Sequence, residues 1–194
     1  MNLPTKITVS RLVLIPVFIA LFLIPFPYHQ LIATAVFVVA SLTDWLDGHI
    51  ARKYNMVTTP GKFLDPVADK VLVASALILA TTLEVGIGDK IAIVVCSVVI
   101  IARELIITCF RTIAATKNVI LAADKIGKAK TATQLTGLTF YLSFAEVGEL
   151  NATVGQVFFY IGFVCLIIAT ALTLISALNY IIRNRAVLKE DSEQ

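Results

Sequence analysis

The sequence predicts an all-α integral membrane protein, a bundle of six transmembrane helices with both termini in the cytoplasm. Hydrophobic residues make up 58% of its 194 positions and charged residues 15%, whereas soluble domains average about 45–50% and about 25%. The chain also contains six successive apolar stretches, and a spanning helix needs roughly 20 mostly apolar residues. A chain of this length has room for one such bundle, so residues 1–194 are predicted to form a single membrane domain.

Each apolar stretch is predicted to form one helix. No small-residue cleavage site follows Pro25 and Pro27, so we interpret the first stretch as a retained helix and not as a signal peptide. The fifth stretch is short and contains several threonines, and we expect it to be tilted or shielded by its neighbours. The six stretches comprise residues 9–26, 31–51, 67–83, 91–113, 132–145 and 154–182.

The basic residues of the short connections predict the orientation, because lysine and arginine are retained on the cytoplasmic side. The connections 25–30, 84–90 and 146–153 contain Lys90 as their only basic residue. The chain ends and the other two connections contain Lys6, Arg11, Arg52, Lys53, Lys62, Lys117, Lys125, Lys128, Lys130, Arg183, Arg185 and Lys189. Both termini are therefore predicted to be cytoplasmic, and this placement accounts for the net charge of +3 without a nucleic-acid partner.

The three cysteines indicate neither a disulfide framework nor a zinc site. Cys96, Cys109 and Cys165 all lie inside apolar runs, and no two of them have a CxxC spacing. We expect them to be buried free thiols.

Four aspartates lie where the second helix ends and the third begins. Asp44 and Asp47 share one helical face, and so do Asp65 and Asp69, so each pair can converge on a common point. Carboxylates at or just below the bilayer surface are costly unless something neutralises them. Ligands that are all hard oxygen favour magnesium or manganese over zinc or copper. The pattern therefore predicts a divalent-metal site.

The residues around these acids are suited to a nucleotide diphosphate. Gly48 and Ala51 lie one turn beyond Asp44 and Asp47, so small side chains leave room on the acidic face. Arg52 offers a planar guanidinium for phosphate. Thr58 can add a hydroxyl, and Gly61 permits a second close approach to the backbone.

Two alternatives explain less of this pattern. Asp65 could be a helix N-cap before Pro66, but Asp44 and Asp47 precede Arg52 by about 12 Å and about 7.5 Å within an apolar helix. A small ion transporter would place its acids at the membrane midplane, next to paired broken helices. The sequence shows no such pair, and its acids lie near one cytoplasmic end.

The pattern DxxDGxxAR, eight residues, GxxxDxxxD resembles the signature of the CDP-alcohol phosphotransferases, and every position of that signature is present. The resemblance implies that the first three aspartates bind two magnesium (or manganese) ions. It implies that the fourth, Asp69, also approaches a metal and acts as the catalytic base. It further implies that Gly48, Arg52 and Gly61 hold the CDP group.

Beyond the signature, the chain is similar to the bacterial phosphatidylglycerophosphate synthases. The likeness lies in the stretches NLPTKITVSRLVLIP, TDWLDGHIARKYN, FLDPVADKVLVA, IARELIIT and IGKAKT. It implies transfer of a phosphatidyl group from CDP-diacylglycerol to glycerol 3-phosphate, giving phosphatidylglycerophosphate and CMP. It also implies a homodimer in the bacterial inner membrane, with the active site at the cytoplasmic face.

Cationic residues after the motif predict where the acceptor's phosphate binds, namely Arg103, Arg111, Lys128 and Lys130. A phosphate-bearing acceptor needs such a pocket, whereas serine does not. Serine, inositol phosphate and phosphatidylglycerol remain rival acceptors. The lysines also fit topology and attraction to anionic lipid. Arg103 lies inside an apolar segment and has the alternative of pairing with Glu104 or with a neighbouring helix.

Overall fold

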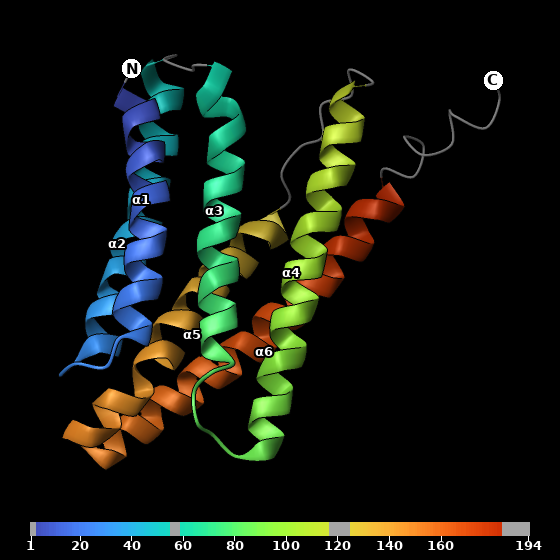
Figure 1. The fold of residues 1–194 in the computed structure, drawn as a ribbon. Helices are drawn as coiled ribbons and strands as arrows, with labels where there is room; N and C mark the ends of the chain where they lie inside the picture. The colour runs from blue at the N-terminus through green and yellow to red at the C-terminus, as the bar shows by residue number, and fades with distance from the viewer. Residues whose placement is uncertain (1–2, 55–58, 117–124, 184–194) are drawn as a thin grey trace.

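The computed structural model describes residues 3–54, 59–116 and 125–183, and the side chains of residues 10–43, 67–114 and 126–182. This part of the chain forms six helices and no strand (Figure 1). They are α1 (Leu3–Leu23), α2 (His29–Tyr54), α3 (Thr59–Ala80), α4 (Ile87–Thr116), α5 (Lys125–Leu150) and α6 (Ala152–Arg183). The predicted all-α fold with six helices is confirmed, and each helix extends beyond its apolar stretch at one end or both.

The helices alternate in direction (Figure 1). The start of α1, the end of α2, the start of α3 and the end of α4 all lie toward the upper side of the view, whereas the turns that follow α1, α3 and α5 lie toward the lower side. The pair α5 and α6 runs obliquely across the other helices. This up-and-down order is the one that successive spanning helices require.

The helices expose apolar side chains along their outer faces. Val98, Leu178 and Ile182 are each more than 60% exposed. The segments Ile87–Ala114 and Ala152–Ile182 are long and apolar enough to cross a membrane. Soluble proteins rarely leave such extended apolar surface uncovered, so these faces are consistent with a membrane protein.

The helix α5 continues beyond its apolar stretch at both ends, over residues 125–131 and 146–150, and the hydroxyl groups inside the stretch do not interrupt it. Thr133, Thr139 and Ser143 each donate a hydrogen bond to the main-chain carbonyl four residues earlier, at 2.7–2.9 Å. Hydroxyls that are satisfied within their own helix do not interrupt it. The helix also packs against α2, α3 and α6, so the expectation that its neighbours shield it is confirmed.

Two glycines let α5 and α6 pack closely along their length. A Cβ atom at Gly155 would lie 2.3 Å from the Cα of Gly148, and one at Gly162 would lie 2.6 Å from the main-chain nitrogen of Tyr141. Neither space holds even a methyl group. The two helices therefore form one rigid antiparallel unit.

The start of α2 is held by a carboxylate from α5. Glu146 accepts hydrogen bonds from the main-chain N–H groups of Gln30 (3.0 Å) and Leu31 (2.9 Å), and lies 3.6 Å from the ring of His29. The preceding residue, Tyr28, has a left-handed φ of 62°. A negative charge at a helix N-terminus is stabilising, so this contact fixes the α1–α2 turn to α5.

One prediction from sequence needs correction here, and one alternative is excluded. The cysteines are free as predicted, but only Cys96 is buried; Cys109 is exposed and Cys165 is half-buried. Their surroundings are apolar because α4 and α6 carry apolar side chains on every face, outer as well as inner. The N-cap alternative for Asp65 is wrong, because α3 begins at Thr59 and Asp65 lies in its second turn.

Candidate active site

The four aspartates of the motif lie on two neighbouring helices at one end of the bundle. Asp44 and Asp47 belong to the last half of α2, and Asp65 and Asp69 to the first half of α3. These two helices contact each other, and α1 packs against both. The side chains of the first three aspartates lie outside the described residues, whereas Asp69 is described and half-buried. The backbone thus brings both pairs of acids to one end.

The helical backbone also supports the predicted nucleotide face. Because α2 continues to Tyr54, Asp44, Asp47, Gly48 and Ala51 fall within an arc of about 100° at 100° per residue. Arg52 lies at the edge of this arc. Gly61 lies in the first turn of α3, and Thr58 lies outside the described residues.

Two arginines of α4 are anchored by polar side chains of α6. Nη2 of Arg103 donates a hydrogen bond to Oγ of Ser176 at 2.8 Å. Nε of Arg111 donates to the hydroxyl of Tyr180 at 3.2 Å, and its guanidinium carbon lies 5.4 Å from the centroid of that ring. Arg103 and Arg111 are about 12 Å apart along α4, whereas their anchors are only about 6 Å apart along α6. The anchors thus draw the two cations together.

A lysine of α5 completes the cationic group. Lys130 is only 2% exposed, and its ammonium contacts the Oε1 atom of Glu104 on α4. Nη1 of Arg103 lies 3.7 Å from the same oxygen. Lys128 is exposed, and two residues along a helix place it on another side of α5. The structure thus brings together Arg103, Arg111 and Lys130, which we call the cationic cluster, and leaves Lys128 apart.

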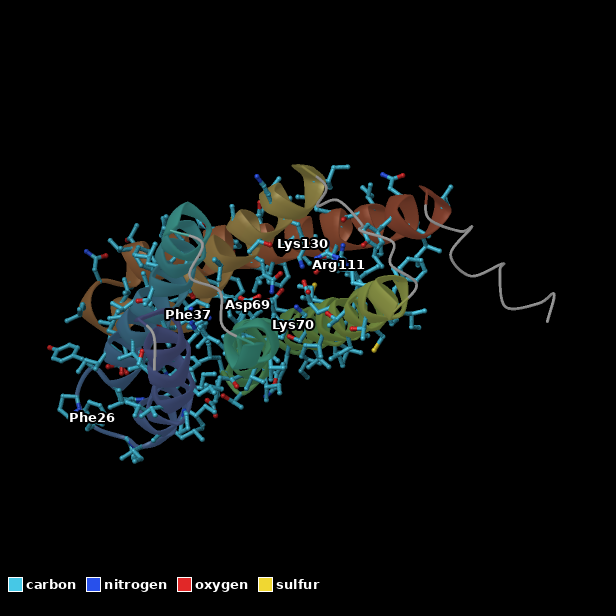
Figure 2. The ribbon with its side chains drawn as sticks, turned by 90° about the horizontal axis from the view of Figure 1, so that it is seen from above. Phe26, Phe37, Asp69, Lys70, Arg111 and Lys130 are labelled. Carbon is cyan, nitrogen blue, oxygen red and sulfur yellow. The ribbon has the colours of Figure 1, made fainter. Side chains whose placement is uncertain are left out.

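The cationic cluster adjoins the acidic end of α3. The carboxylate of Asp69 is near enough to act on the charge of Lys130, as is the guanidinium of Arg103. In Figure 2, seen from above, Asp69, Lys130 and Arg111 lie on the inner sides of α3, α5 and α4. Cations of this kind can bind an anionic substrate, and a carboxylate beside them can accept a proton from it.

Comparison with known proteins identifies the family. The profile of the CDP-alcohol phosphatidyltransferases matches residues 1–175. The chain belongs to the CDP-alcohol phosphatidyltransferase family. A Bacillus subtilis (strain 168) relative named CDP-diacylglycerol–glycerol-3-phosphate 3-phosphatidyltransferase is 36% identical over 200 residues, covering 97% of each chain. A Shigella flexneri relative of the same name is 37% identical over 189 residues, covering 96% of this chain and 97% of its own.

A third relative within the CDP-alcohol phosphatidyltransferase family carries a different name. The cardiolipin synthase (CMP-forming) of Oryza sativa subsp. japonica is 40% identical over 151 residues, which cover 74% of this chain and 46% of that protein. Membership in the family therefore does not by itself determine the acceptor substrate. The residues of the cationic cluster are the ones that can distinguish one acceptor from another.

The donor set of this family member fits a divalent metal. Among the described side chains no three histidine, cysteine, aspartate or glutamate residues gather at one point, but three of the four motif aspartates are not among those side chains. Four carboxylates from two neighbouring helices offer only hard oxygen ligands, which suit magnesium or manganese. The metal site remains a prediction that the backbone of α2 and α3 accommodates.

Sequence reasoning missed three polar residues near this site. Ser176 and Tyr180 are buried, and the signal that could have found them is a pair of polar residues one turn apart in a long apolar helix. Arg11 was used only as a topology signal, yet it is 1% exposed in α1, which packs against the two helices that carry the aspartates.

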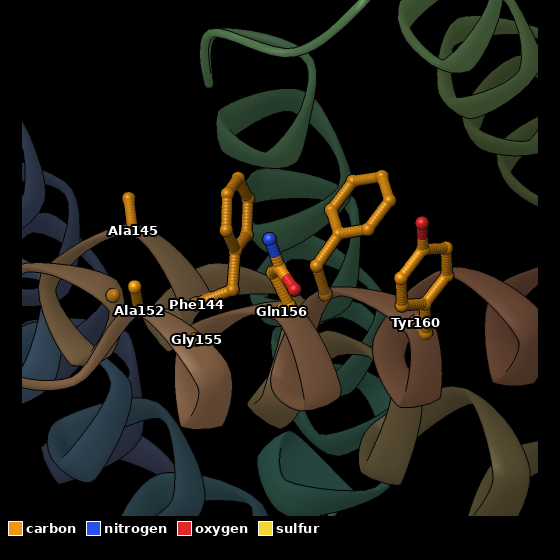
Figure 3. A pocket seen from close by; sticks show the side chains of 8 residues that line it. Phe144, Ala145, Ala152, Gly155, Gln156 and Tyr160 are labelled. Carbon is orange, nitrogen blue, oxygen red and sulfur yellow. The ribbon is translucent and has the colours of Figure 1, made fainter.

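A separate hollow lies beside the α5–α6 turn (Figure 3). It has a volume of about 400 Å³ and is lined by Phe144, Gln156, Phe159 and Tyr160 and by the backbone of Gly155, among others. None of its eight lining residues is charged. It lies at the far end of α5 from the cationic cluster, so it is not part of the active site of this phosphatidyltransferase.

Proposed function

We propose that this chain transfers the phosphatidyl group of CDP-diacylglycerol to glycerol 3-phosphate, giving phosphatidylglycerophosphate and CMP. The observation that carries the proposal is the convergence of Arg103, Arg111 and Lys130 beside Asp69. The names of the relatives that match nearly the whole chain support it. Phosphatidylglycerol synthesis is therefore the process to which the chain contributes.

The donor binds at the ends of α2 and α3 in this proposal. The four aspartates hold two magnesium (or manganese) ions, whose chemistry when bound is to neutralise the pyrophosphate oxygens of CDP-diacylglycerol and the charge on the leaving CMP. The small residues of the motif leave room for the nucleotide, and Arg52 pairs with its phosphate. The donor-binding residues are Gly48, Ala51, Arg52, Thr58 and Gly61.

Asp69 serves as the base in this proposal. It removes the proton from the acceptor's hydroxyl, and that oxygen then forms a bond to the phosphorus that bears the diacylglycerol. The bond from this phosphorus to CMP breaks, and CMP leaves. Asp69 suits the role because its carboxylate acts on the charge of Lys130 in the cationic cluster.

The cationic cluster favours a phosphate monoester as the acceptor. Such a group carries a charge of about −1.5 to −2 at pH 7, and Arg103 and Arg111 offer planar donors for it. Serine has no phosphate, and phosphatidylglycerol carries only a diester with a single negative charge. Lys128 lies outside the cluster and is exposed on another side of α5, and we retain it as an outer contact.

An acceptor panel tests the proposal. Purified protein is given CDP-diacylglycerol, magnesium and one acceptor at a time: glycerol 3-phosphate, serine, inositol phosphate or phosphatidylglycerol. We expect a lipid product and CMP with glycerol 3-phosphate, and neither when EDTA replaces magnesium. A product with phosphatidylglycerol instead would assign the chain to the reaction named for its rice relative.

We also propose that all six helices cross the bacterial inner membrane, with both termini and the active site at the cytoplasmic face. The same-side ends of α1, α2, α3 and α4 support this orientation (Figure 1). In a background without native cysteines, Thr59→Cys and Ser192→Cys should resist an impermeant thiol reagent applied to intact cells. Glu149→Cys, in the exposed last turn of α5, should react and serves as the control.

The family resemblance further supports a homodimer. Mass measurement by light scattering in detergent tests this, with a mass of two chains as the expected result and a mass of one chain as the contrary result.

A further inference from the structure

Glu104 is a charged residue inside the candidate acceptor site that the proposed reaction does not use. It lies on α4, next to Arg103 in sequence, and its side chain is 25% exposed. Its Oε1 atom contacts the ammonium of Lys130 on α5. A carboxylate at the centre of a phosphate-binding group repels the substrate, so its presence requires a reason.

Burial of Lys130 provides that reason. The side chain of this lysine is 3% exposed, and removing the partner of a buried charge leaves an ion that neither water nor protein compensates. A lysine side chain also has a long and flexible stem. The carboxylate of Asp69 also acts on this ammonium, but the proposed reaction assigns Asp69 to the metal and to the acceptor's proton. Without Glu104, Lys130 would therefore leave its position or lose its proton, and in either state it would not bind phosphate.

The charges of the group support a permanent role for Glu104. Around this group lie four cations, from Arg103, Arg111, Lys130 and Lys70, and two carboxylates, from Glu104 and Asp69. Together they leave a charge of +2. A phosphate monoester has a charge of about −2 when fully ionised. Glu104 therefore matches the site to a dianion, and it does not need to leave when the acceptor binds.

Hydrogen-bond donors remain for the acceptor with Glu104 in place. An ammonium has three donors, of which Glu104 engages one. Nε of Arg103 is buried, and no acceptor among the described residues lies within hydrogen-bond distance of it. Since Arg103 is already fixed by Ser176, these unused donors point to a bound oxyanion.

We propose that Glu104 is a positioning residue of the acceptor site, which holds the ammonium of Lys130 charged and in place for the phosphate of the acceptor. The inference rests on the proposed function, because it assigns Lys130 to the acceptor. It adds a residue that acts through Lys130 and touches neither the metal nor CDP-diacylglycerol.

The test compares four proteins: the wild type, Glu104→Gln, Lys130→Met and the double variant that carries both changes. In Glu104→Gln the KM for glycerol 3-phosphate should rise about ten- to a hundredfold, the usual scale for a lost charged hydrogen bond, with the KM for CDP-diacylglycerol unchanged. Lys130→Met should show a similar rise. The double variant should match Lys130→Met, because Glu104 has nothing left to position. Glu84→Gln, in the exposed α3–α4 connection, is the matched control and should resemble the wild type.

The outcomes separate this inference from the proposed function. An unchanged acceptor KM in Glu104→Gln overturns the inference, as does a further rise when Glu104→Gln is added to Lys130→Met. The second comparison decides the question even if Glu104→Gln does not fold, because the double variant leaves no unpaired buried ammonium. If the wild type itself makes no product from glycerol 3-phosphate, the proposed function has failed instead.

Discussion

Replacing Gly162 by alanine tests how strictly the α5–α6 interface is packed. The added Cβ would lie 2.6 Å from the main-chain nitrogen of Tyr141 and 2.8 Å from its Cα, where ordinary contacts begin at 3.4 Å. The shortfall is about 0.8 Å, and main-chain atoms cannot move aside by changing rotamer. The two helices must therefore separate.

Two opposing effects determine the size of the change. Alanine is favoured over glycine in a helix by up to about 1 kcal/mol, whereas overpacking a well-packed interface costs about 1–3 kcal/mol. We expect the clash to prevail, with a net loss of about 1–2 kcal/mol in the free energy of unfolding. For a chain of this size the melting temperature should fall by about 2–8 °C.

Thermal unfolding in detergent measures this change. Gly88→Ala is the matched control, because a Cβ at Gly88 on α4 would meet nothing within 4 Å, and its melting temperature should equal or exceed that of the wild type. The reasoning is refuted if Gly162→Ala melts as high as Gly88→Ala. Since α5 carries Lys130 and α6 carries Ser176, the KM for glycerol 3-phosphate should also rise in Gly162→Ala.

Three further substitutions test the site and its support. In Asp69→Asn turnover should fall by about 10²–10⁴ because the base is lost, and added magnesium should not restore it. In Asp44→Asn added magnesium should restore part of the activity, because a metal ligand is lost. Equal rescue of both variants by magnesium would contradict these roles. Tyr180→Phe keeps the ring against Arg111 but loses the hydroxyl acceptor, so the KM for glycerol 3-phosphate should rise about fivefold, and an unchanged value would argue against the anchor. Glu146→Gln weakens the cap on α2, so the free energy of unfolding should drop by about 1 kcal/mol with turnover kept; a wild-type melting curve would refute that cap.

The helices and the acidic motif could be predicted because their signals are local. Apolar stretches mark the helices, and the 100° period places Asp44 and Asp47 on one face without knowledge of any other helix. The length of α5 was underestimated because apolar content was the criterion, whereas the polar and charged segments at its ends, residues 125–131 and 146–150, are helical as well.

The acceptor site could be predicted only in part because its contacts join distant segments. The arginines were identified from their position in an apolar helix, but Ser176 lies 73 residues from Arg103, and Tyr180 lies 69 from Arg111. Pairing across such distances depends on how α4 and α6 cross. Likewise, Glu104 was considered a partner for Arg103, and the structure adds Lys130 as its closer contact.

The carboxylate that caps α2 also bears on the order in which the bundle is completed. The main-chain donors of Gln30 and Leu31 emerge from the ribosome 115 or more residues before Glu146. At about 5–20 residues per second, that interval is about 6–23 s. During this time the first hairpin has its local hydrogen bonds, such as that from the main-chain N–H of His29 to the carbonyl of Phe26, but the donors of Gln30 and Leu31 do not yet have their carboxylate. The α1–α2 turn therefore gains its contact with Glu146 only when α5 is in place. A chain that stops before residue 146 would lack this contact.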